Sequence, residues 1–278
     1  MDYLYQAQER FKRQHGSTAA GAHRQTADAR QQMPIVYSTT KAISLSADAM
    51  RSYRLITGFQ EGAFVDAYKM LRAQVIQQLR QKGWNVLGIS SPSTQEGKTL
   101  TAVNLSLALA MDLAHTVLLV DADLHRPAVH RAFGMEQQVP GLSEYLFDDL
   151  PLAQLLIHPG IGRFVFLPGG RPIKNSAEAL ASPKMAALVQ ELRHRYPSRL
   201  VVFDLPPLLS RADVLGFSSY IDALLLVVEE GRTATAAVEQ AMGVLKGSVP
   251  ILGGILNKSG RTTLTGREAK RLVQDNLE

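Results

Sequence analysis

Residues 84–110 place a short apolar run, a tight loop ending in Gly97-Lys98-Thr99 and a segment of helical spacing next to one another, and this order strongly constrains the fold. The apolar run 84–89 predicts a buried strand. The apolar residues of the amphipathic helix predicted after the loop are Leu100, Val103, Leu107 and Ala110. A loop between a strand and a helix can cradle nucleotide phosphates, because its backbone N–H groups and the positive end of the helix dipole face the anion.

The last residues of this loop carry the side chains that a Mg²⁺-bound nucleotide requires. Lys98 would reach the β- and γ-phosphates, and the Thr99 hydroxyl would ligate Mg²⁺. The predicted cofactor-binding residues of the loop are Gly97, Lys98, Thr99 and Leu100. The G-x-x-x-x-G-K-[ST] pattern is incomplete, since Pro92 stands where its first glycine belongs. The alternative interpretation is therefore a lysine at the start of an ordinary surface helix.

Two aspartates follow a second apolar run. Residues 116–120 predict a buried parallel strand, which delivers Asp121 and Asp123 at its carboxyl end, where open α/β sheets bind their ligands. The two carboxylates are separated by one residue on an extended segment, so they would share one face. One can hold Mg²⁺ or its waters while the other accepts a proton. The alternative is a solvated Asp-Ala-Asp turn, in which two like charges lack a neighbouring cation.

A third apolar run, 200–203, ends at Asp204 and continues into Pro206-Pro207, which cannot extend a central strand. Asp204 is placed where a second acidic group can hold a metal-bound water. Six strands are predicted in all, at 84–90, 116–121, 163–168, 199–204, 222–228 and 250–256, with helices between them that include 182–195 and 235–245. This alternation predicts a P-loop NTPase-like α/β fold, with a mostly parallel sheet flanked by helices on both faces.

Seven short motifs occur in order along the chain. They are Ser91-Pro92 with Glu96-Gly-Lys-Thr99, Leu118-Leu-Val-Asp-Ala-Asp-Leu-His-Arg-Pro127, Gly141-Leu-Ser-Glu-Tyr-Leu146, Leu167-Pro-Gly-Gly170, Asn175-Ser-Ala-Glu-Ala-Leu180, Phe203-Asp-Leu-Pro-Pro207 and Leu256-Asn-Lys-Ser259. This series resembles the bacterial tyrosine kinases of capsule and exopolysaccharide synthesis, and most closely the soluble type that works with a separate membrane protein. The resemblance covers about residues 33–259.

The resemblance implies an ATP- and Mg²⁺-dependent protein-tyrosine kinase that phosphorylates itself and regulates the synthesis and export of such polysaccharides. Asp121 matches the acceptor of the tyrosine proton, and Asp123 matches a residue that acts through the metal. Lys98 joins them as a catalytic residue. The implied metal ligands are Thr99, Asp123 and Asp204. Asn257 matches a residue near the nucleotide base, and the alternative is an asparagine that caps a strand end.

The resemblance also implies a partner, a membrane-bound polysaccharide co-polymerase or chain-length-determinant protein, and a cytoplasmic location at the inner face of the membrane through that partner. Asp66, Lys69 and Arg72, in a helix predicted over 61–80, resemble a Glu-x-x-Arg-x-x-Arg self-association motif. The alternative is a charge ladder within that helix. The residues predicted to form its buried face are Phe64, Ala67, Leu71, Val75 and Leu79.

The chain departs from the resembled pattern at three places. His125 occupies an arginine position, Gln95 stands where glycine is frequent, and residues 259–278 contain no tyrosine where the family typically has a tyrosine cluster. We therefore expect self-phosphorylation at Tyr3 or Tyr5; the alternative is that these two residues begin a short helix. A second functional hypothesis is an ATP-binding switch without kinase chemistry, either a tyrosine-poor regulator of the polysaccharide machinery or a partitioning or septum-site ATPase. Ser93 stands where those ATPases carry a second loop lysine.

Composition divides the chain into three predicted regions: a basic, partly disordered arm over 1–55, the nucleotide-binding domain over 56–259 and a tail over 260–278. The arm holds eight Lys/Arg against four acids, so it could contact anionic lipid, an acidic partner or nucleic acid. Because its charges are dispersed without interleaved aromatics, we expect a solvated linker and no nucleic acid partner. The chain has no cysteine and no apolar run near the roughly 20 residues of a membrane span.

Overall fold

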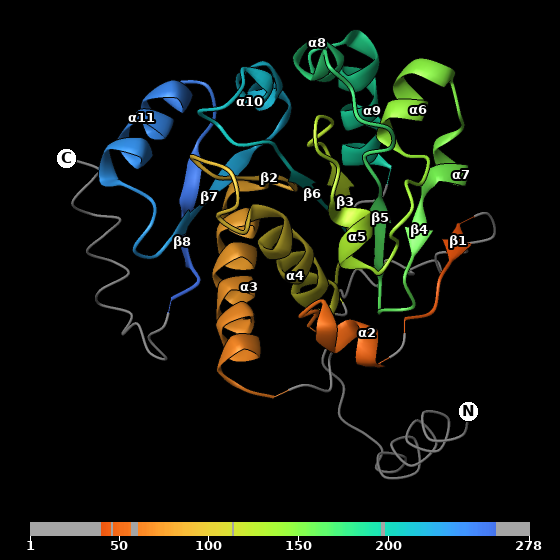
Figure 1. Cartoon of the computed structure of the whole chain (residues 1–278), viewed down its shortest axis with the longest axis horizontal. Helices are drawn as coiled ribbons and strands as arrows, with labels where there is room; N and C mark the ends of the chain where they lie inside the picture. Colours follow the sequence, from red (N-terminus) through yellow and green to blue (C-terminus); the bar gives the residue numbers. More distant parts are fainter. Residues whose placement is uncertain (1–39, 46, 57–60, 113, 196–197, 260–278) are drawn as a thin grey trace, which may run out of the picture. The chain divides into compact units, whose positions relative to one another are not determined.

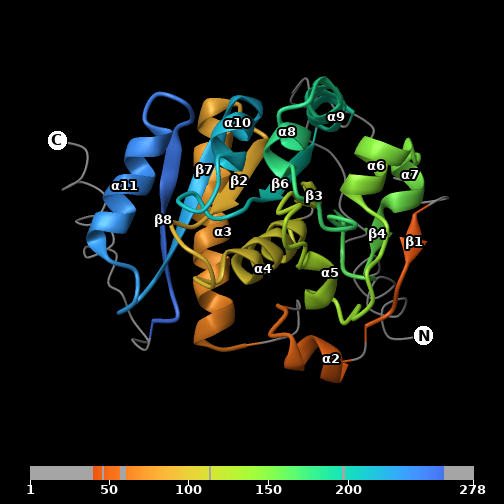
Figure 2. The same ribbon diagram turned by 45° about the horizontal axis from the view of Figure 1, so that its top comes forward.

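The computed structural model describes residues 40–45, 47–56, 61–112, 114–195 and 198–259. Tyr3, Tyr5, most of the predicted arm and all of the predicted tail lie outside these residues. The described chain forms one eight-stranded sheet in the order β1-β4-β5-β3-β6-β2-β7-β8, with β1 and β8 at its edges (Figures 1 and 2). The strands are β1 (Lys41–Ala42), β2 (Val86–Ser90), β3 (Thr116–Asp121), β4 (Ile157–His158), β5 (Phe164–Leu167), β6 (Arg199–Asp204), β7 (Ala223–Glu229) and β8 (Ile251–Asn257).

The predicted mostly parallel sheet is confirmed. Neighbouring strands pair in parallel everywhere except between β4 and β5, which pair antiparallel through Ile157 and Phe166. All six predicted strands are present, each within two residues of its predicted bounds. The two strands that the sequence did not predict, β1 and β4, have two residues each, which is too short for an apolar period to be visible.

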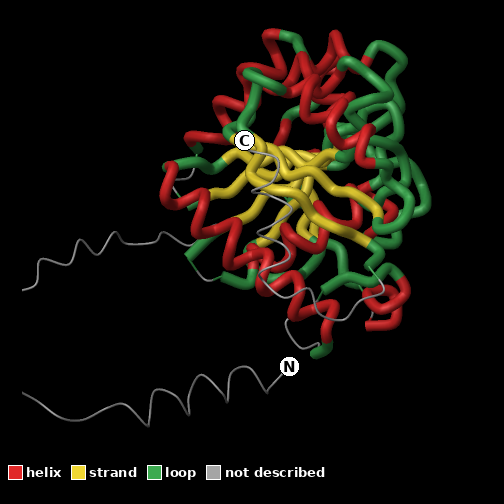
Figure 3. The backbone as a smooth tube through the Cα atoms, turned by 90° about the vertical axis from the view of Figure 1, so that its left-hand side faces the viewer, coloured by secondary structure: helices red, strands yellow, loops and turns green. Residues whose placement is uncertain are grey.

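Helices cover both faces of the sheet, as predicted (Figure 3). They are α2 (Ala47–Ser52), α3 (Ala63–Lys82), α4 (Lys98–Ala110), α5 (Val129–Ala132), α6 (Leu142–Asp148), α7 (Leu152–Leu155), α8 (Ser176–Leu180), α9 (Pro183–His194), α10 (Asp213–Phe217) and α11 (Thr235–Leu245), with a 3₁₀ turn, η1, over Ser218–Tyr220. On one face, Leu87 and Val202 pack with α3 and α4 in the main core. On the other, Phe203 meets Phe217 of α10 with ring centroids 4.9 Å apart. Alternate residues of β6 therefore face opposite helix layers.

Helix α4 differs from its prediction because it is buried nearly all round. From Thr101 to Ala110 every residue is buried, whereas Leu100, predicted to face the core, is only half-buried. The helix lies beside α3 (Figure 1) and also contacts α5 and the strands β2, β3, β5 and β6, so little of its surface stays open. Asn104, on this helix, is fully buried and exchanges hydrogen bonds with the backbone at Arg54 and Ile56.

The predicted buried face of α3 is wrong at two positions. Phe64 is 44% exposed and Ala67 is exposed, while Val65 and Tyr68 are buried together with Val75 and Leu79. Tyr68 takes the buried position that was predicted for Phe64, because the side of the helix that carries Tyr68 faces α4. No helix among the described residues is both long enough and apolar enough to cross a membrane.

Within the described residues, regular secondary structure and core residues already occur before residue 56, the predicted start of the domain. Strand β1 pairs with β4, and Leu55 and Ile56 are each only 1% exposed in the core. The predicted boundary between arm and domain at residues 55 and 56 stays a prediction, and the segment from β1 to Ile56 contributes to the same core as α3 and α4.

Candidate functional site

The predicted site residues lie together at the carboxyl ends of the neighbouring strands β2, β3 and β6. Asp121 is the register partner of Asp204 across β3 and β6, and Ile89, just before the loop, is the partner of Asp204 across β2 and β6. Parallel pairing puts successive strand ends side by side. The loop from Ser91 to Gly97 then leads directly into α4, whose first two residues are Lys98 and Thr99.

Lys98 points into a cluster of carboxylates. Its Nζ lies 2.8 Å from Asp123 Oδ2, 3.7 Å from Asp204 Oδ1 and 3.4 Å from the Thr99 hydroxyl. The Lys98 side chain is only 11% exposed. Burial alone would lower the pKa of this ammonium group, but the nearby carboxylates of Asp204, Asp123 and Asp121 outweigh burial and raise the pKa. Lys98 therefore stays charged, and it holds the cluster together.

The two strand-end carboxylates are fully buried and incompletely paired. Burial, with the negative charge of Asp204, raises the pKa of Asp121 to about 8, although backbone N–H groups of Val129 and Ala128 donate to Oδ2 at 2.9 and 2.8 Å. Burial also raises the pKa of Asp204, against the opposing charge of Lys98. Among the described residues, neither oxygen of Asp204 accepts a hydrogen bond, and nor does Oδ1 of Asp121.

These oxygens, which accept no hydrogen bond from the described residues, fit a Mg²⁺-bound nucleotide. Magnesium prefers oxygen ligands and is usually held by one or two carboxylates together with substrate phosphates and waters. The described residues contain no cluster of three or more His, Asp or Glu that would hold a metal by themselves. Asp204, Asp123 and Thr99 are thus suited to hold Mg²⁺ with the phosphates as co-ligands. The loop and the first turn of α4 supply the N–H groups and the positive helix end for those phosphates.

The loop itself is fastened by residues from distant strands. Asn257, the last residue of β8, donates from Nδ2 to the Glu96 carbonyl at 2.8 Å. Gly97 has a φ of 94°, and a Cβ at this position would lie 2.0 Å from Asn257 Nδ2. The structure therefore brings Asn257 against the phosphate loop itself, and its predicted contact with a nucleotide base stays a prediction.

Three residues that the sequence analysis did not select also hold this loop. Thr233 Oγ1 donates to Glu96 Oε1 at 2.6 Å, and Lys258 Nζ donates to the Gln95 carbonyl at 2.8 Å. Lys258 also pairs with Glu229 at 2.8 Å. Lys258 belongs to the resembled motif at 256–259, whereas only their position at or just beyond the carboxyl end of β7 could have identified Glu229 and Thr233.

Two resembled motifs without an assigned role pack beside Asp121. The Leu142 and Ser143 N–H groups donate to the carbonyls of Pro168 and Gly169 at 2.7 and 3.0 Å. A Cβ at Gly169 would lie 2.8 Å from Pro127 and 3.2 Å from the Asp121 carboxyl carbon. This close approach explains why glycine follows Pro168, and it keeps the Asp121 carboxylate shielded from water.

His125, which departs from the resembled pattern, lies beside a second basic residue. Arg211 Nη2 is 2.8 Å from His125 Nε2, and it comes from the segment between β6 and α10. His125 is two residues from Asp123 in the sequence. The structure thus places a guanidinium group next to the position where the resembled family has arginine, although it comes from a different strand connection.

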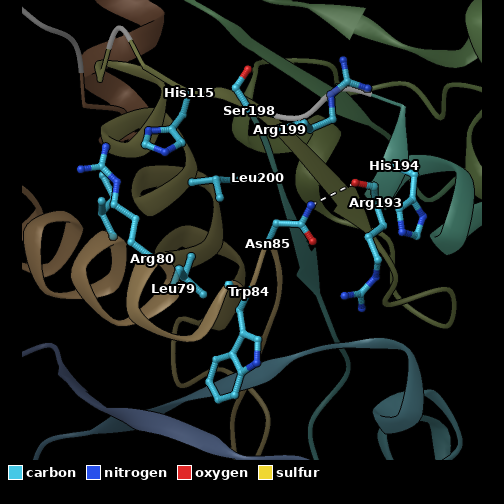
Figure 4. A pocket seen from close by; sticks show the side chains of 12 residues that line it. Leu79, Arg80, Trp84, Asn85, His115, Arg193, His194, Ser198, Arg199 and Leu200 are labelled. Carbon is cyan, nitrogen blue, oxygen red and sulfur yellow. Dashed lines mark hydrogen bonds between the residues drawn. The ribbon is translucent and has the colours of Figure 1, made fainter. Parts of the chain in front are cut away.

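The cavity at the opposite end of the sheet is a less suitable candidate site. It has a volume of about 470 Å³, and its basic residues include Arg80, Arg193 and His194 (Figure 4). These three lie in the last turns of α3 and α9, where positive side chains stabilise the negative helix ends. Asp222 also pairs with Arg193 at 2.6 Å. Local structure therefore accounts for these charges without a ligand.

Comparison with known proteins gives consistent similarities. No family model matches the chain. The chain is 31% identical over 195 residues to the tyrosine-protein kinase YwqD of Bacillus subtilis, covering 69% of this chain and 80% of that protein. It is 30% identical over 194 residues to the tyrosine-protein kinase etk of Escherichia coli K12, covering 69% of this chain but only 26% of that protein.

Solved structures agree with these similarities. The VpsO kinase domain superposes with a TM-score of 0.64 at 29% identity, covering 71% of this chain and 96% of that chain. The septum site-determining protein MinD of Pyrococcus horikoshii, complexed with Mg-ADP, superposes with a TM-score of 0.55 at 22% identity, covering 68% of this chain and 76% of that one. The second likeness concerns the fold alone, and it confirms the predicted P-loop NTPase-like architecture.

Proposed function

Because the chain belongs to the family of bacterial tyrosine-protein kinases, we propose that it is an ATP- and Mg²⁺-dependent protein-tyrosine kinase that phosphorylates itself. The observation that carries the proposal is the position of Lys98, at the end of the phosphate loop and within reach of Asp123 and Asp204. The motifs of the chain resemble those of kinases in polysaccharide synthesis. We therefore propose that the chain regulates the synthesis and export of an exopolysaccharide or capsule polysaccharide.

The residues divide the chemistry among them. Lys98, released from Asp123 when phosphates enter, binds the transferred phosphoryl group and offsets its negative charge. Thr99, Asp123 and Asp204 would hold Mg²⁺, which would neutralise charge on the phosphate oxygens. Asp121 accepts the tyrosine proton at Oδ1, the oxygen that accepts no hydrogen bond from the described residues. The Ala128 and Val129 N–H groups fix the other oxygen, so the base keeps one orientation.

The site is tested by incubating the purified full chain with ATP and Mg²⁺ and mapping phosphotyrosine by mass spectrometry. Lys98→Met and Thr99→Ala should each abolish phosphotyrosine and weaken ATP binding by more than about tenfold, since charge-assisted contacts to phosphate are lost. Lys246→Met, an exposed lysine at the end of α11, is the matched control and should leave both unchanged. Unaltered ATP affinity in both loop variants would overturn the assignment of the phosphate site.

The same experiment separates the kinase from the alternative function. Hydrolysis of ATP with no phosphotyrosine on the chain or on an added partner would favour the nucleotide-operated switch. Phosphotyrosine at Tyr3 or Tyr5 would support self-phosphorylation in the N-terminal segment, whereas phosphotyrosine confined to Tyr145 would contradict that acceptor site.

The partner is proposed from the same resemblance. A cytoplasmic segment of a membrane-bound polysaccharide co-polymerase would bind this chain, activate it and hold it at the inner face of the membrane. The expected result is faster phosphotransfer by the full chain when that segment is added. An equal rate with and without the segment would contradict the partner. The proposal includes no nucleic acid partner.

A further inference from the structure

The contact between Thr233 and Glu96 joins two segments that are far apart in the sequence. Glu96 lies inside the phosphate loop and is only 2% exposed, while Thr233 lies between β7 and α11. Glu96 Oε1 accepts from the Thr233 hydroxyl at 2.6 Å, and Oε2 accepts from the Ser93 N–H at 2.9 Å. One buried carboxylate therefore fixes the start of the loop and ties it to the end of β7.

The direction of the Thr233 hydroxyl is set by its surroundings. Thr233 Oγ1 accepts a hydrogen bond from the Glu229 N–H at 2.8 Å, and the Thr233 N–H donates back to the Glu229 carbonyl at 3.1 Å. Because the backbone N–H uses one lone pair of this oxygen, the hydroxyl proton is directed to Glu96. The chain of contacts runs from the end of β7 through Thr233 and Glu96 to the loop amide of Ser93.

The loop needs such an anchor because two of its residues have left-handed backbone angles. Gln95 has a φ of 65° and Gly97 has a φ of 94°, so they flank Glu96 on both sides. A residue with a side chain, such as Gln95, adopts this region only at a cost in conformational energy. Without the anchor, the loop would spend less time in this conformation, and its apparent affinity for phosphates would fall in proportion.

We propose that Thr233 is a positioning residue for the phosphate loop: through Glu96 it holds the loop in the conformation that receives the nucleotide phosphates. This proposal rests on the proposed function, since it names a residue that prepares the same site. The β7–α11 connection thereby becomes part of the nucleotide site without contacting the nucleotide.

The first test measures Mg-ADP binding to the full chain by calorimetry. Thr233→Val, which removes the hydroxyl at nearly constant volume, should weaken Mg-ADP binding by about ten- to a hundredfold, as expected for the loss of one hydrogen bond to a carboxylate. Thr233→Ser keeps the hydroxyl and should restore affinity to within about twofold. Thr235→Val, an exposed threonine two residues away, is the matched control and should bind as the unmodified chain does.

A double variant tests whether Thr233 acts through Glu96. Glu96→Leu removes both acceptor oxygens, so it should weaken binding by itself, and adding Thr233→Val should cause little further loss because the contact is already broken. Fully additive losses would overturn the proposed route through Glu96. Unchanged Mg-ADP affinity in Thr233→Val would overturn the positioning role.

A third measurement needs no nucleotide and therefore separates this proposal from the proposed function. Amide hydrogen exchange at Ser93 in the nucleotide-free chain should be faster in Thr233→Val than in Thr233→Ser or Thr235→Val. If the unmodified chain fails to bind Mg-ADP, the proposed function fails, while faster exchange at Ser93 still supports the anchor. Identical exchange in all three variants would overturn the anchor even where nucleotide binding is intact.

Discussion

At the scale of single residues, the site concentrates negative charge in a place with little water. Asp121 and Asp204 are both fully buried, and Asp123 is nearly so. Lys98 is the cation that the structure places among them, 2.8 Å from Asp123 and 3.7 Å from Asp204. Burying carboxylates without full pairing costs free energy, which binding of Mg²⁺ and phosphates would recover. The folded, nucleotide-free chain is therefore sensitive to the protonation of these groups.

The first prediction concerns the stability of the nucleotide-free chain as a function of pH. Its pKa of about 8, against an ordinary value of 3.8, lets folded Asp121 keep a proton that the unfolded chain releases. The stability contribution of this proton is complete below pH 3.8 and is lost as pH rises through about 8. We expect the free energy of unfolding in urea to fall more steeply between about pH 4 and pH 8 for the unmodified chain than for Asp121→Asn.

Asp204 supplies the internal comparison for this experiment. Its pKa is raised as well, so it changes stability in the same direction and remains in the Asp121→Asn variant. The variant should therefore keep part of the pH dependence. Equal slopes in the two proteins would contradict the raised pKa of Asp121.

Because an amide cannot accept the tyrosine proton, Asp121→Asn should also slow phosphotransfer by about 10²–10⁴-fold.

At the scale of elements, the end of β8 closes over the phosphate loop. The strand is the last of the sheet, and its register with β7 pairs Asn257 with Glu229, so both residues end at the loop. Asn257 donates to the Glu96 carbonyl and fills the space where a side chain at Gly97 would lie. Helix α4 can begin at Lys98 only because Gly97 combines a φ of 94° with the absence of a Cβ.

A second prediction compares Gly97→Ala with Gly83→Ala. Both glycines have positive φ, 94° and 68°, but a Cβ at Gly83 meets nothing within 4 Å, whereas a Cβ at Gly97 meets Asn257 at 2.0 Å. Backbone strain alone costs about 1 kcal/mol, so we expect this loss in Gly83→Ala. Gly97→Ala should lose distinctly more free energy of unfolding, because Asn257 must move.

A double variant isolates the contact. Replacing Asn257 by Ala in the Gly97→Ala background should recover part of the loss, since the clash is removed. Unfolding in urea measures all three variants and the unmodified chain. Equal losses in the two single glycine variants would show that strand β8 does not constrain the loop.

At the scale of the whole molecule, α3 links the core to a surface that could meet another subunit. Asp66 and Lys69 are exposed and paired at 3.1 Å. Arg72, predicted to share their face, is half-buried and donates to the Ala108 carbonyl on α4 at 3.3 Å. The predicted self-association surface is therefore divided, because Arg72 also stabilises the packing of α3 against α4.

The last prediction uses this division. If the exposed end of α3 is a subunit contact, Lys69→Glu should reduce the assembled mass in sedimentation and lower phosphotransfer, while the melting temperature barely changes. An exposed pair within a helix contributes only about 0.2–0.5 kcal/mol, so stability should not respond. The swapped variant Asp66→Lys with Lys69→Asp keeps a pair within the helix. Assembly of Lys69→Glu equal to that of the unmodified chain would restrict α3 to a structural role.

Much of this architecture follows from the sequence, because local patterns determine it. Strands β2, β3, β5 and β6 are buried at every residue, and a strand buried on both faces needs no signal other than an apolar run. Asp121 and Asp204 end such runs, so parallel pairing alone places them side by side. Gly97, Lys98 and Thr99 are likewise fixed by the order of strand, loop and helix.

Only the tertiary structure decided what surrounds these residues. Phe64 is exposed and Tyr68 is buried, because the helical period allows either face and only packing against α4 selects the buried one. The contact of Thr233 with Glu96 joins residues 137 positions apart. Glu96 belongs to the loop motif, but no local pattern marks Thr233 as its partner. The raised pKa of Asp121 likewise arises from burial and from the neighbouring charge of Asp204, both of which exist only once the strands have paired.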